Sequence, residues 1–326
     1  LQGAPPRQTG ARNHPRNGSA DTAERQMKSK DNVVTVAGIQ LTHPGRVLYP
    51  EQGITKRDLA QYYEQIAGWI LPHLEGRPLT LVRCPAGHHK ECFYQRHPRN
   101  ASSLPLHSLA LREKGKVAHY LSVDSLAGLV ALVQMGTLEL HTWGSRMPNV
   151  DRPDRIIFDL DPAPDVPWRA IAEGAARLRA RLRDLDQDGL IKTTGGKGLH
   201  IVVATAPKQS WQFVKDFSRA LAETLVRDDP DRFIATMSKT ERRGKIFVDY
   251  LRNSRSATAV SAYSARARAG APVSVPLRWE ELEKDLRAHF TIGNTAKRLA
   301  RLKEDPWGDY EAMRRPLTTK LRRRLQ

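Results

Sequence analysis

The 326-residue chain has very few cysteines and no long apolar run. Its two cysteines, Cys84 and Cys92, exclude a scaffold held by several disulfides, and neither has a convincing catalytic context. No apolar stretch approaches the ~20 residues of a membrane-spanning helix, nothing resembles a signal peptide, and the Gly-x-Ser-x-Gly motif of serine hydrolases is absent. We therefore expect a protein of the reducing cytoplasm with no membrane partner.

The chain is also short of acidic residues, with 35 Asp and Glu against 53 Lys and Arg, and its formal net charge is +18. Such an excess predicts a polyanionic partner, most simply nucleic acid. A merely solubilising charge is the alternative, but the arginines are scattered through segments that we expect to be ordered. The apolar fraction of 40% is ordinary and is enough for a substantial core.

Large apolar side chains are almost absent from residues 1–30, which are rich in Pro, Gly, Arg and small polar residues. We expect a disordered linker or tail there, because such a segment cannot bury enough surface to offset its ordering entropy. One folded region should cover 31–326, with an N-terminal module (about 31–150), a second module (about 151–310) and a basic C-terminal helix. Since the chain begins with Leu, we expect it to be a piece of a longer protein.

Apolar periodicity predicts a mixed α/β chain. Thr55 and Asp58 have the spacing of a capping box at the start of a helix. We expect helices over residues 55–70, 125–134, 168–185, 210–227, 279–288, 295–303 and 312–325. We expect strands over residues 32–36, 79–83, 118–123, 137–142, 156–160, 190–194, 199–204, 245–250 and 258–263.

The most informative motif is the acidic pair Asp159 and Asp161 at the end of the apolar strand IIFDLDP. Side chains at i and i+2 of a strand share one face, so the two carboxylates can bind hard divalent cations together. Asp249, at the end of the strand KIFVD, adds a third carboxylate. Three such groups suit a two-metal phosphoryl-transfer site. The alternatives are a solvated strand end for the pair and an arginine partner for Asp249.

A glycine-rich turn, TTGGKG, lies between the two acidic strands. It is not a Walker A loop, because Gly198 follows Lys197 where Ser or Thr is required and no helix follows. Its glycines allow backbone N–H groups to approach an anion, and Thr193, Thr194 and Lys197 add donors. An ordinary tight hairpin is the alternative.

Paired arginines form a third group. Arg266 and Arg268 alternate as they would on a strand, which would present both guanidinium groups to one phosphate chain. Arg242, Arg243 and Arg252 flank the Asp249 strand and can face the same anion. Any one of them alone is equally well explained as part of a solvated basic loop.

The sequence around Cys84, His88, Cys92 and His97 has a regular spacing that invites a zinc-site interpretation. It lacks the Cys-x-x-Cys pair of structural zinc sites, so we do not favour zinc. The aromatic pair at 93–94, among basic residues, is better explained as a platform on which a base stacks. Two core aromatics of a strand are the alternative.

Several motifs together resemble the polymerase domain of bacterial ATP-dependent DNA ligase D, in the archaeo-eukaryotic primase superfamily. They are FDLDP, TTGGKGLHIVV, KIFVDYLRN, AVSAYSARARAGAPVSVPLRWEEL, LTHPGRVLYPEQGITKRD and LELHTWGSR, and the match runs from about residue 33 to 310. The resemblance implies a primase-polymerase core of mixed β-sheet with flanking helices, built from two intermeshed α/β modules.

The resemblance implies a nucleotidyltransferase of non-homologous end joining, which adds ribo- or deoxyribonucleotides to a 3′-hydroxyl at DNA ends and gaps. It implies two divalent cations, with manganese preferred to magnesium, and nucleoside triphosphates as substrates. Implied partners are DNA ends with a 5′-phosphate, ligase and nuclease domains of the same polypeptide, and bacterial Ku, in a nucleoid-associated cytoplasmic location. A primase acting on unprimed template and a non-catalytic DNA-end-binding module are the rival functions.

Residue roles are carried over motif by motif. The metal ligands and catalytic residues would be Asp159, Asp161 and Asp249. Arg46 and Lys56 would hold the downstream 5′-phosphate, although many relatives have Lys at the position of Arg46, and Phe93 would stack at the template side. The residues that would hold the incoming nucleotide are His141, Thr193, Thr194, Lys197, Gly198, His200, Arg252, Ser264, Arg266 and Arg268.

Overall fold

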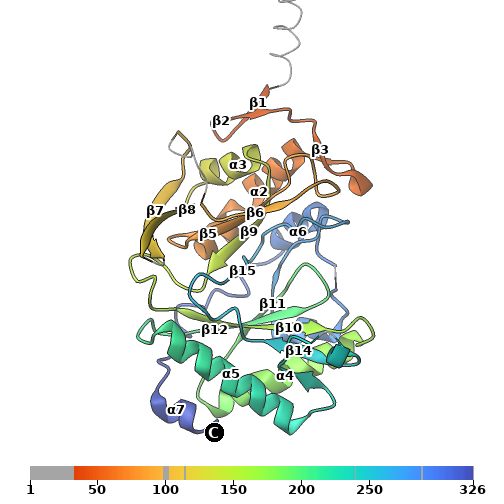
Figure 1. Cartoon of the computed structure of the whole chain (residues 1–326). Coiled ribbons are helices and arrows are strands. Elements are labelled where there is room, and N and C mark those ends of the chain that lie inside the picture. The colour runs from red at the N-terminus through yellow and green to blue at the C-terminus, as the bar shows by residue number, and fades with distance from the viewer. Residues whose placement is uncertain (1–32, 98–102, 114, 239, 288, 326) are drawn as a thin grey trace, which may run out of the picture.

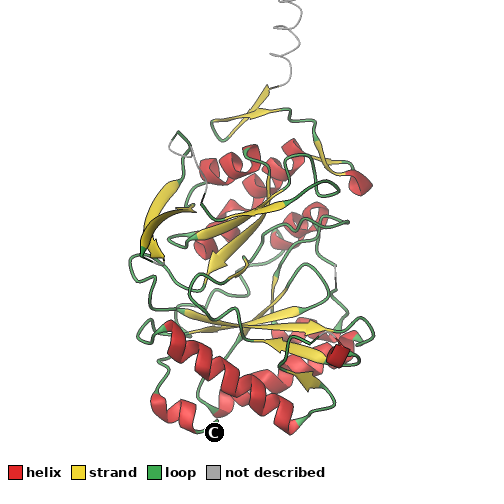
Figure 2. Cartoon of the chain, viewed as in Figure 1, coloured by secondary structure: helices red, strands yellow, loops and turns green. Residues whose placement is uncertain are grey.

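The computed structural model describes residues 33–325, except for 98–102, 114, 239 and 288. The tail expected over residues 1–30 lies outside the described residues. Within them, the fold is mixed α/β, as the sequence predicts, and it is divided between two main sheets (Figures 1 and 2). None of the described helices is both long and apolar enough to cross a lipid bilayer.

The first main sheet has four antiparallel strands in the order β15-β9-β5-β6. Helices α2 and α3 pack against each other in the same half of the molecule. The elements of this half before β10 are β1 (Val33–Val36), β2 (Ile39–Thr42), β3 (Val47–Tyr49), the 3-10 helix η1 (Pro50–Gln52), β4 (Ile54–Thr55), α2 (Lys56–Leu74), β5 (Leu79–Arg83), β6 (Phe93–Gln95), β7 (His107–Glu113), β8 (Lys116–Ser122), α3 (Leu126–Gln134) and β9 (Thr137–Trp143).

Helix α2 begins with the capping box that the sequence predicts. The Thr55 side chain accepts a hydrogen bond from the Asp58 backbone N–H, and the Asp58 carboxylate accepts one from the Thr55 N–H at 2.7 Å. The helix buries Leu59, Tyr63 and Ile66 completely or almost so, at the spacing of one helical face. The local sequence therefore fixes both the start and the orientation of α2.

The second main sheet has six strands in the order β13-β14-β10-β12-β11-β16, antiparallel except for the β13–β14 pair. Helices α4 and α5 lie side by side against one face of this sheet (Figures 1 and 2). The elements are β10 (Arg155–Pro162), α4 (Trp168–Asp184), β11 (Leu190–Thr193), β12 (Leu199–Ala204), α5 (Trp211–Asp228), β13 (Phe233–Ile234), the 3-10 helix η2 (Thr240–Arg242), β14 (Ile246–Asp249), β15 (Thr258–Val260), β16 (Pro276–Leu277), the 3-10 helix η3 (Trp279–Glu283), α6 (Ile292–Leu299) and α7 (Thr319–Arg323).

The two halves are intermeshed rather than joined by a single linker. Strand β15 follows the acidic strand β14 in sequence but pairs with β9 in the first sheet. Helix α6, near the end of the chain, packs beside α2 (Figure 1). A buried ion pair adds a further connection, with the two terminal guanidinium nitrogens of Arg77 each 2.7 Å from an Asp154 carboxylate oxygen.

Three predicted elements are wrong in extent. The helix expected over 279–288 is only the short 3-10 turn η3, and the long C-terminal helix over 312–325 shrinks to α7. Pro316 explains the second difference, because proline removes a backbone donor and its ring clashes with the preceding turn, so the helix begins only after the Thr318 cap. The strand over 258–263 ends at Val260, since Tyr263 adopts a left-handed φ of 62°.

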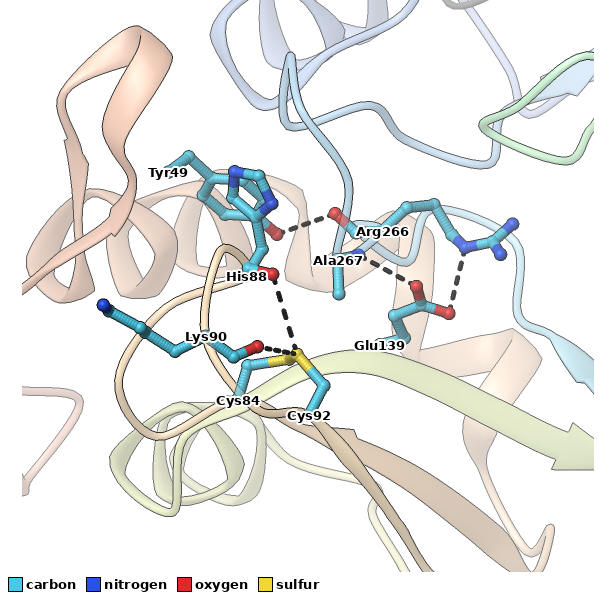
Figure 3. Close-up of a disulfide and its surroundings, with 8 residues drawn as sticks. All are labelled: Tyr49, Cys84, His88, Lys90, Cys92, Glu139, Arg266 and Ala267. Atoms are coloured by element: carbon cyan, nitrogen blue, oxygen red, sulfur yellow. Dashed lines mark hydrogen bonds and ion pairs between the residues drawn. A yellow bond between two sulfur atoms is a disulfide. The ribbon is translucent and has the colours of Figure 1, made fainter.

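The sequence also failed to predict that Cys84 and Cys92 are joined by a disulfide, across a separation of 8 residues (Figure 3). Both sulfur atoms are used in that bond, so they are not available as zinc ligands in this structure. The loop that the disulfide closes leads into β6, and His88 within it stacks on Tyr49 with ring centroids 5.2 Å apart.

Candidate active site

Two of the three predicted carboxylates are direct neighbours across a strand pair. Strands β10 and β14 run antiparallel, and Asp159 is the cross-strand partner of Asp249. Asp161 lies two residues further along β10, so the pleat places it on the same face as Asp159. The register of this strand pair thus gathers acidic residues that are about ninety positions apart in sequence.

Two basic side chains contact these carboxylates, the guanidinium of Arg252 and the imidazole of His200, whose burial lowers its own pKa to about 4. Arg252 lies 3.5 Å from an Asp159 oxygen and 3.2 Å from an Asp249 oxygen, and His200 lies 3.4 Å from Asp159. Burial alone would raise the pKa of Asp159, but His200 and Arg252 outweigh it and hold that pKa at about 2. Burial and the neighbouring Asp159 charge raise the pKa of Asp249 despite Arg252. Asp159 is therefore ionised at neutral pH.

Asp161 pairs with a different set of cations, the amino group of Lys197 and the guanidinium of Arg242, each at 3.4 Å. In the described part of the chain, no three acidic, histidine or cysteine side chains are gathered closely enough to hold a metal ion as they stand. The donor chemistry nevertheless fits a hard divalent cation, because all three groups offer carboxylate oxygens and their present partners are exchangeable cations.

The glycine-rich turn has the strand–turn–strand form that the sequence predicts, between the antiparallel strands β11 and β12. Gly195 has φ of +68°, a conformation that L side chains rarely adopt. A Cβ atom on Gly198 would lie 2.4 Å from the backbone oxygen of Leu160, in the acidic strand. The turn therefore needs glycine to pack directly against the strand that carries Asp159 and Asp161.

These elements enclose a cavity of about 270 Å3. It brings together ten of the residues that the sequence proposed: His141, Asp159, Asp161, Thr194, Lys197, Gly198, His200, Arg252, Arg266 and Arg268. Arg266 and Arg268 reach the cavity from an irregular loop and not from the strand that their alternation predicts, because the positive φ values of Tyr263 and Ala271 interrupt extended backbone.

Two other proposed nucleotide ligands use their hydroxyl groups inside the protein. The Thr193 hydroxyl accepts a hydrogen bond from the Val275 N–H at 2.9 Å. The Ser264 hydroxyl accepts one from the Leu140 N–H at 2.9 Å, and both side chains are buried. In this structure they fasten strands around the cavity and do not line it.

Two further residues lie near the cavity, Tyr94, which the sequence placed only in the aromatic pair, and Glu139, which sequence reasoning missed. Tyr94 lines it and meets His141 edge to face, with ring centroids 6.2 Å apart. Glu139 is buried beside His141, with its carboxylate 2.7 Å from the imidazole Nε2. The signal for Glu139 was present in the LELH motif, where Glu and His have the i, i+2 spacing of one strand face.

Arg46 and Lys56, the proposed 5′-phosphate ligands, lie close together. The Lys56 backbone N–H donates to the Arg46 carbonyl at 2.9 Å. Arg46 is exposed, whereas Lys56 is only 5% exposed and its amino group donates to Thr42 O and to Gln134 Oε1. Burial, followed by the nearby Arg46 charge, lowers the pKa of Lys56 to about 8. An anion at this position would raise that pKa again and stabilise the charged amino group.

Phe93, proposed to stack at the template side, is 40% exposed on β6, with the Arg83 guanidinium 5.3 Å from its ring centroid. Tyr94 follows it on the opposite face of the strand and lines the cavity. The two aromatics therefore serve different surfaces, which the sequence alone treated as one platform.

The fold and this cavity together are those of a nucleotidyltransferase. A family model described as "LigD, primase-polymerase domain" matches residues 55–307. The chain belongs to the LigD primase-polymerase domain family, which confirms the resemblance noted from the sequence motifs. Membership of this family supports a DNA repair polymerase role in non-homologous end joining.

Individual relatives agree with this assignment. The multifunctional non-homologous end joining protein LigD of Pseudomonas aeruginosa is 39% identical over 89% of this chain, and that of Mycolicibacterium smegmatis is 33% identical over 84%. The chain spans only 35% and 36% of the length of these two proteins. A solved structure, the polymerase domain from Mycobacterium tuberculosis ligase D in complex with DNA, matches with a TM-score of 0.79 at 31% identity, over 84% of this chain and 98% of that one.

Proposed function

We propose that this chain is a DNA repair polymerase that adds ribo- or deoxyribonucleotides to the 3′-hydroxyl at DNA ends and gaps in bacterial non-homologous end joining. The observation that carries this proposal is the cross-strand pairing of Asp159 with Asp249 beside a cavity lined by Lys, Arg and His side chains. The carboxylates and the cationic side chains pair with each other in this structure, and metal ions with phosphates between them would give both sets partners of opposite charge.

Asp159, Asp161 and Asp249 would hold two divalent cations, manganese or magnesium. When bound, the cations neutralise charge on the triphosphate and lower the pKa of the primer hydroxyl. The phosphates of the nucleotide would replace the carboxylates as partners of Lys197 and Arg252, since these two side chains already border the cavity. Arg266 and Arg268 would bind phosphate oxygens, which suits the planar donor geometry of a guanidinium.

DNA recognition would use the surface next to this cavity. Arg46 and Lys56 would bind the 5′-phosphate on the far side of a gap, and Phe93 would stack on a template base. The polymerase domain of M. tuberculosis ligase D forms a complex with DNA, which supports a DNA substrate for this chain. Because the chain spans about a third of its curated relatives, we also propose ligase and nuclease domains in the same polypeptide, with bacterial Ku as a partner at the nucleoid.

We propose that residues 31–326 work as one catalytic domain made of two modules that meet near residues 140–150. The pairing of β15 with β9 and the packing of α6 beside α2 support this view. Neither module contains all the cavity residues, because His141 comes from β9 and Asp159 from β10.

The test is primer extension by Asp159→Asn and Asp161→Asn variants on a gapped duplex with manganese or magnesium. Both variants should lose nucleotide addition by at least about a hundredfold and still bind the DNA, because the change removes the negative charge of a proposed metal ligand and leaves the cationic surface. Asp186→Asn is the matched control, since Asp186 is a surface residue at φ of 54°, which Asn tolerates. Wild-type extension by either active-site variant would refute the proposal, and synthesis on unprimed template would favour the primase alternative.

A further inference from the structure

Glu139 is a buried carboxylate in contact with two of the proposed nucleotide ligands. One of its oxygens lies 2.7 Å from His141 Nε2 and 3.0 Å from Arg266 Nε. The other oxygen accepts a hydrogen bond from the Ala267 N–H at 2.8 Å, and Figure 3 shows the carboxylate between Arg266 and Ala267. The Glu139 side chain, on β9 of the first sheet, thus contacts both His141 of the same strand and the loop that carries Arg266.

The strand geometry explains this arrangement. Glu139 and His141 are two residues apart on β9 and therefore share a face of the sheet. Strand β15 pairs with β9 opposite His141, at Val260, and the chain then turns back so that Arg266 reaches the same face. Glu139 is only 5% exposed, so bulk water does not compete for its hydrogen bonds.

The charge states follow from these contacts. Burial would raise the pKa of Glu139, but the hydrogen bond from His141 and the charge of Arg266 outweigh it and hold that pKa at about 2. Burial lowers the pKa of His141 in spite of Glu139. An ionised carboxylate only accepts hydrogen bonds, so neutral His141 must carry its proton on Nε2 and keep Nδ1 as an acceptor.

An acceptor nitrogen does not suit a phosphate, whose oxygens also accept. The donors that every nucleoside triphosphate offers are its sugar hydroxyls. His141 borders the cavity, and no described residue is hydrogen-bonded to its Nδ1. The two partners of Glu139 are therefore suited to different parts of one nucleotide, Arg266 to a phosphate and His141 to a sugar hydroxyl.

We propose that Glu139 is a positioning residue that presents His141 Nδ1 to a sugar hydroxyl of the incoming nucleotide and holds Arg266 toward its phosphates. This inference rests on the proposed function, and it adds a means by which the enzyme distinguishes nucleotides that have the recognised sugar hydroxyl from those that lack it. Glu139 acts through His141 and Arg266 and does not itself touch the reacting atoms.

The conservative variant Glu139→Gln separates this role from a structural one. The Gln amide oxygen can still accept from Ala267 N–H, and the buried Tyr49 hydroxyl still donates to the Arg266 carbonyl at 2.9 Å (Figure 3). The amide NH2 group, however, offers donors where the carboxylate offered acceptors. His141 would then accept at Nε2 and carry its proton on Nδ1, which reverses what it presents to the nucleotide.

The experiment measures single-nucleotide addition on a gapped duplex with ATP, 2′-deoxy-ATP and 3′-deoxy-ATP. For Glu139→Gln we expect the KM for ATP to rise about tenfold with kcat changed less than threefold. The KM for the analogue that lacks the recognised hydroxyl should rise much less, so the discrimination between sugars narrows. Equal changes for all three nucleotides, or no change for any, would overturn the proposal. Glu64→Gln, an exposed glutamate of α2, should match wild type in every measurement.

Two further measurements keep the outcome clear. Nitrogen-15 NMR should show His141 protonated on Nε2 in the wild type and not in Glu139→Gln, while matched circular dichroism and thermal unfolding show that the variant folds. The double variant Glu139→Gln/His141→Ala should discriminate between ATP and its deoxy analogues, measured as the ratio of their KM values, to the same extent as His141→Ala. If the wild type itself added no nucleotide, the proposed function would fail, whereas normal wild-type activity with an unaltered Glu139→Gln variant would refute only the role of Glu139.

Discussion

The substitution Gly198→Ala tests whether the glycine-rich turn must lie directly against the acidic strand. A Cβ atom at this position would be 2.4 Å from the Leu160 backbone oxygen, and contacts of a real Cβ below 3.0 Å essentially never occur. The turn or the end of β10 therefore has to move by at least about 0.6 Å. No rotamer change can relieve the clash, because the obstructing atom belongs to the backbone.

This displacement falls beside the proposed metal ligands. Asp159 and Asp161 flank Leu160, and Lys197 precedes the substituted residue. A misplacement of about 1 Å near reacting groups can lower a rate by about a hundredfold, and overpacking of this kind costs about 1–3 kcal/mol of stability. We expect kcat for nucleotide addition to fall by one to two orders of magnitude. The temperature of thermal unfolding should also fall, while the transition stays cooperative.

The assay is single-turnover primer extension alongside thermal unfolding. Gly68→Ala is the matched control, because Gly68 lies in the interior of α2 and a Cβ there meets nothing within 4 Å. The control should keep full activity and gain up to about 1 kcal/mol, since alanine is the better helix former. A Gly198→Ala protein with wild-type kcat and unchanged unfolding temperature would contradict the close packing of the turn.

Two further predictions concern the DNA surface and the core. Lys56→Ala should mainly remove the preference for gaps that carry a 5′-phosphate, because the present partners of its buried amino group are neutral oxygens and a phosphate would supply the missing negative charge. An unchanged ratio of extension on phosphorylated and unphosphorylated gaps would exclude this role. Asp154→Asn should lower the free energy of unfolding by about 3–5 kcal/mol in urea titrations, because it leaves the charge of the fully buried Arg77 without its carboxylate partner. Burial would raise the pKa of Asp154, but Arg77 and its neighbours lower it to about 2, so its contribution to stability is complete above its unfolded pKa of 3.8 and is lost as pH falls from there through about 2. Wild-type stability that did not fall over this pH range, or that fell equally in Asp154→Asn, would contradict that account.

Features set by a few neighbouring residues could be predicted from the sequence. The alternation of the strand places Asp159 and Asp161 on one face whatever lies around them. The capping box of Thr55 and Asp58 and the Gly-rich turn depend likewise on contacts within a few positions. The role of these motifs in binding a nucleotide was inferred from the family resemblance, because local sequence patterns do not reveal which ligand a site binds.

Features that depend on register or on irregular backbone could not be predicted in the same way. The alternation of Arg266 and Arg268 wrongly indicated a strand, because positive φ values at Tyr263 and Ala271 are set by how that loop packs. The burial of Lys56 depends on Thr42 and on Gln134, which lies 78 positions away in sequence.

The sequence by itself determined the three carboxylates, the turn between them and the excess of cationic side chains. Only the tertiary structure decided that Asp249 stands opposite Asp159, that Cys84 joins Cys92, and that Glu139 holds both His141 and the Arg266 loop. The physical reason is that strand alternation and turn chemistry act between neighbours, whereas strand register and buried polar contacts are chosen by the packing of the whole chain.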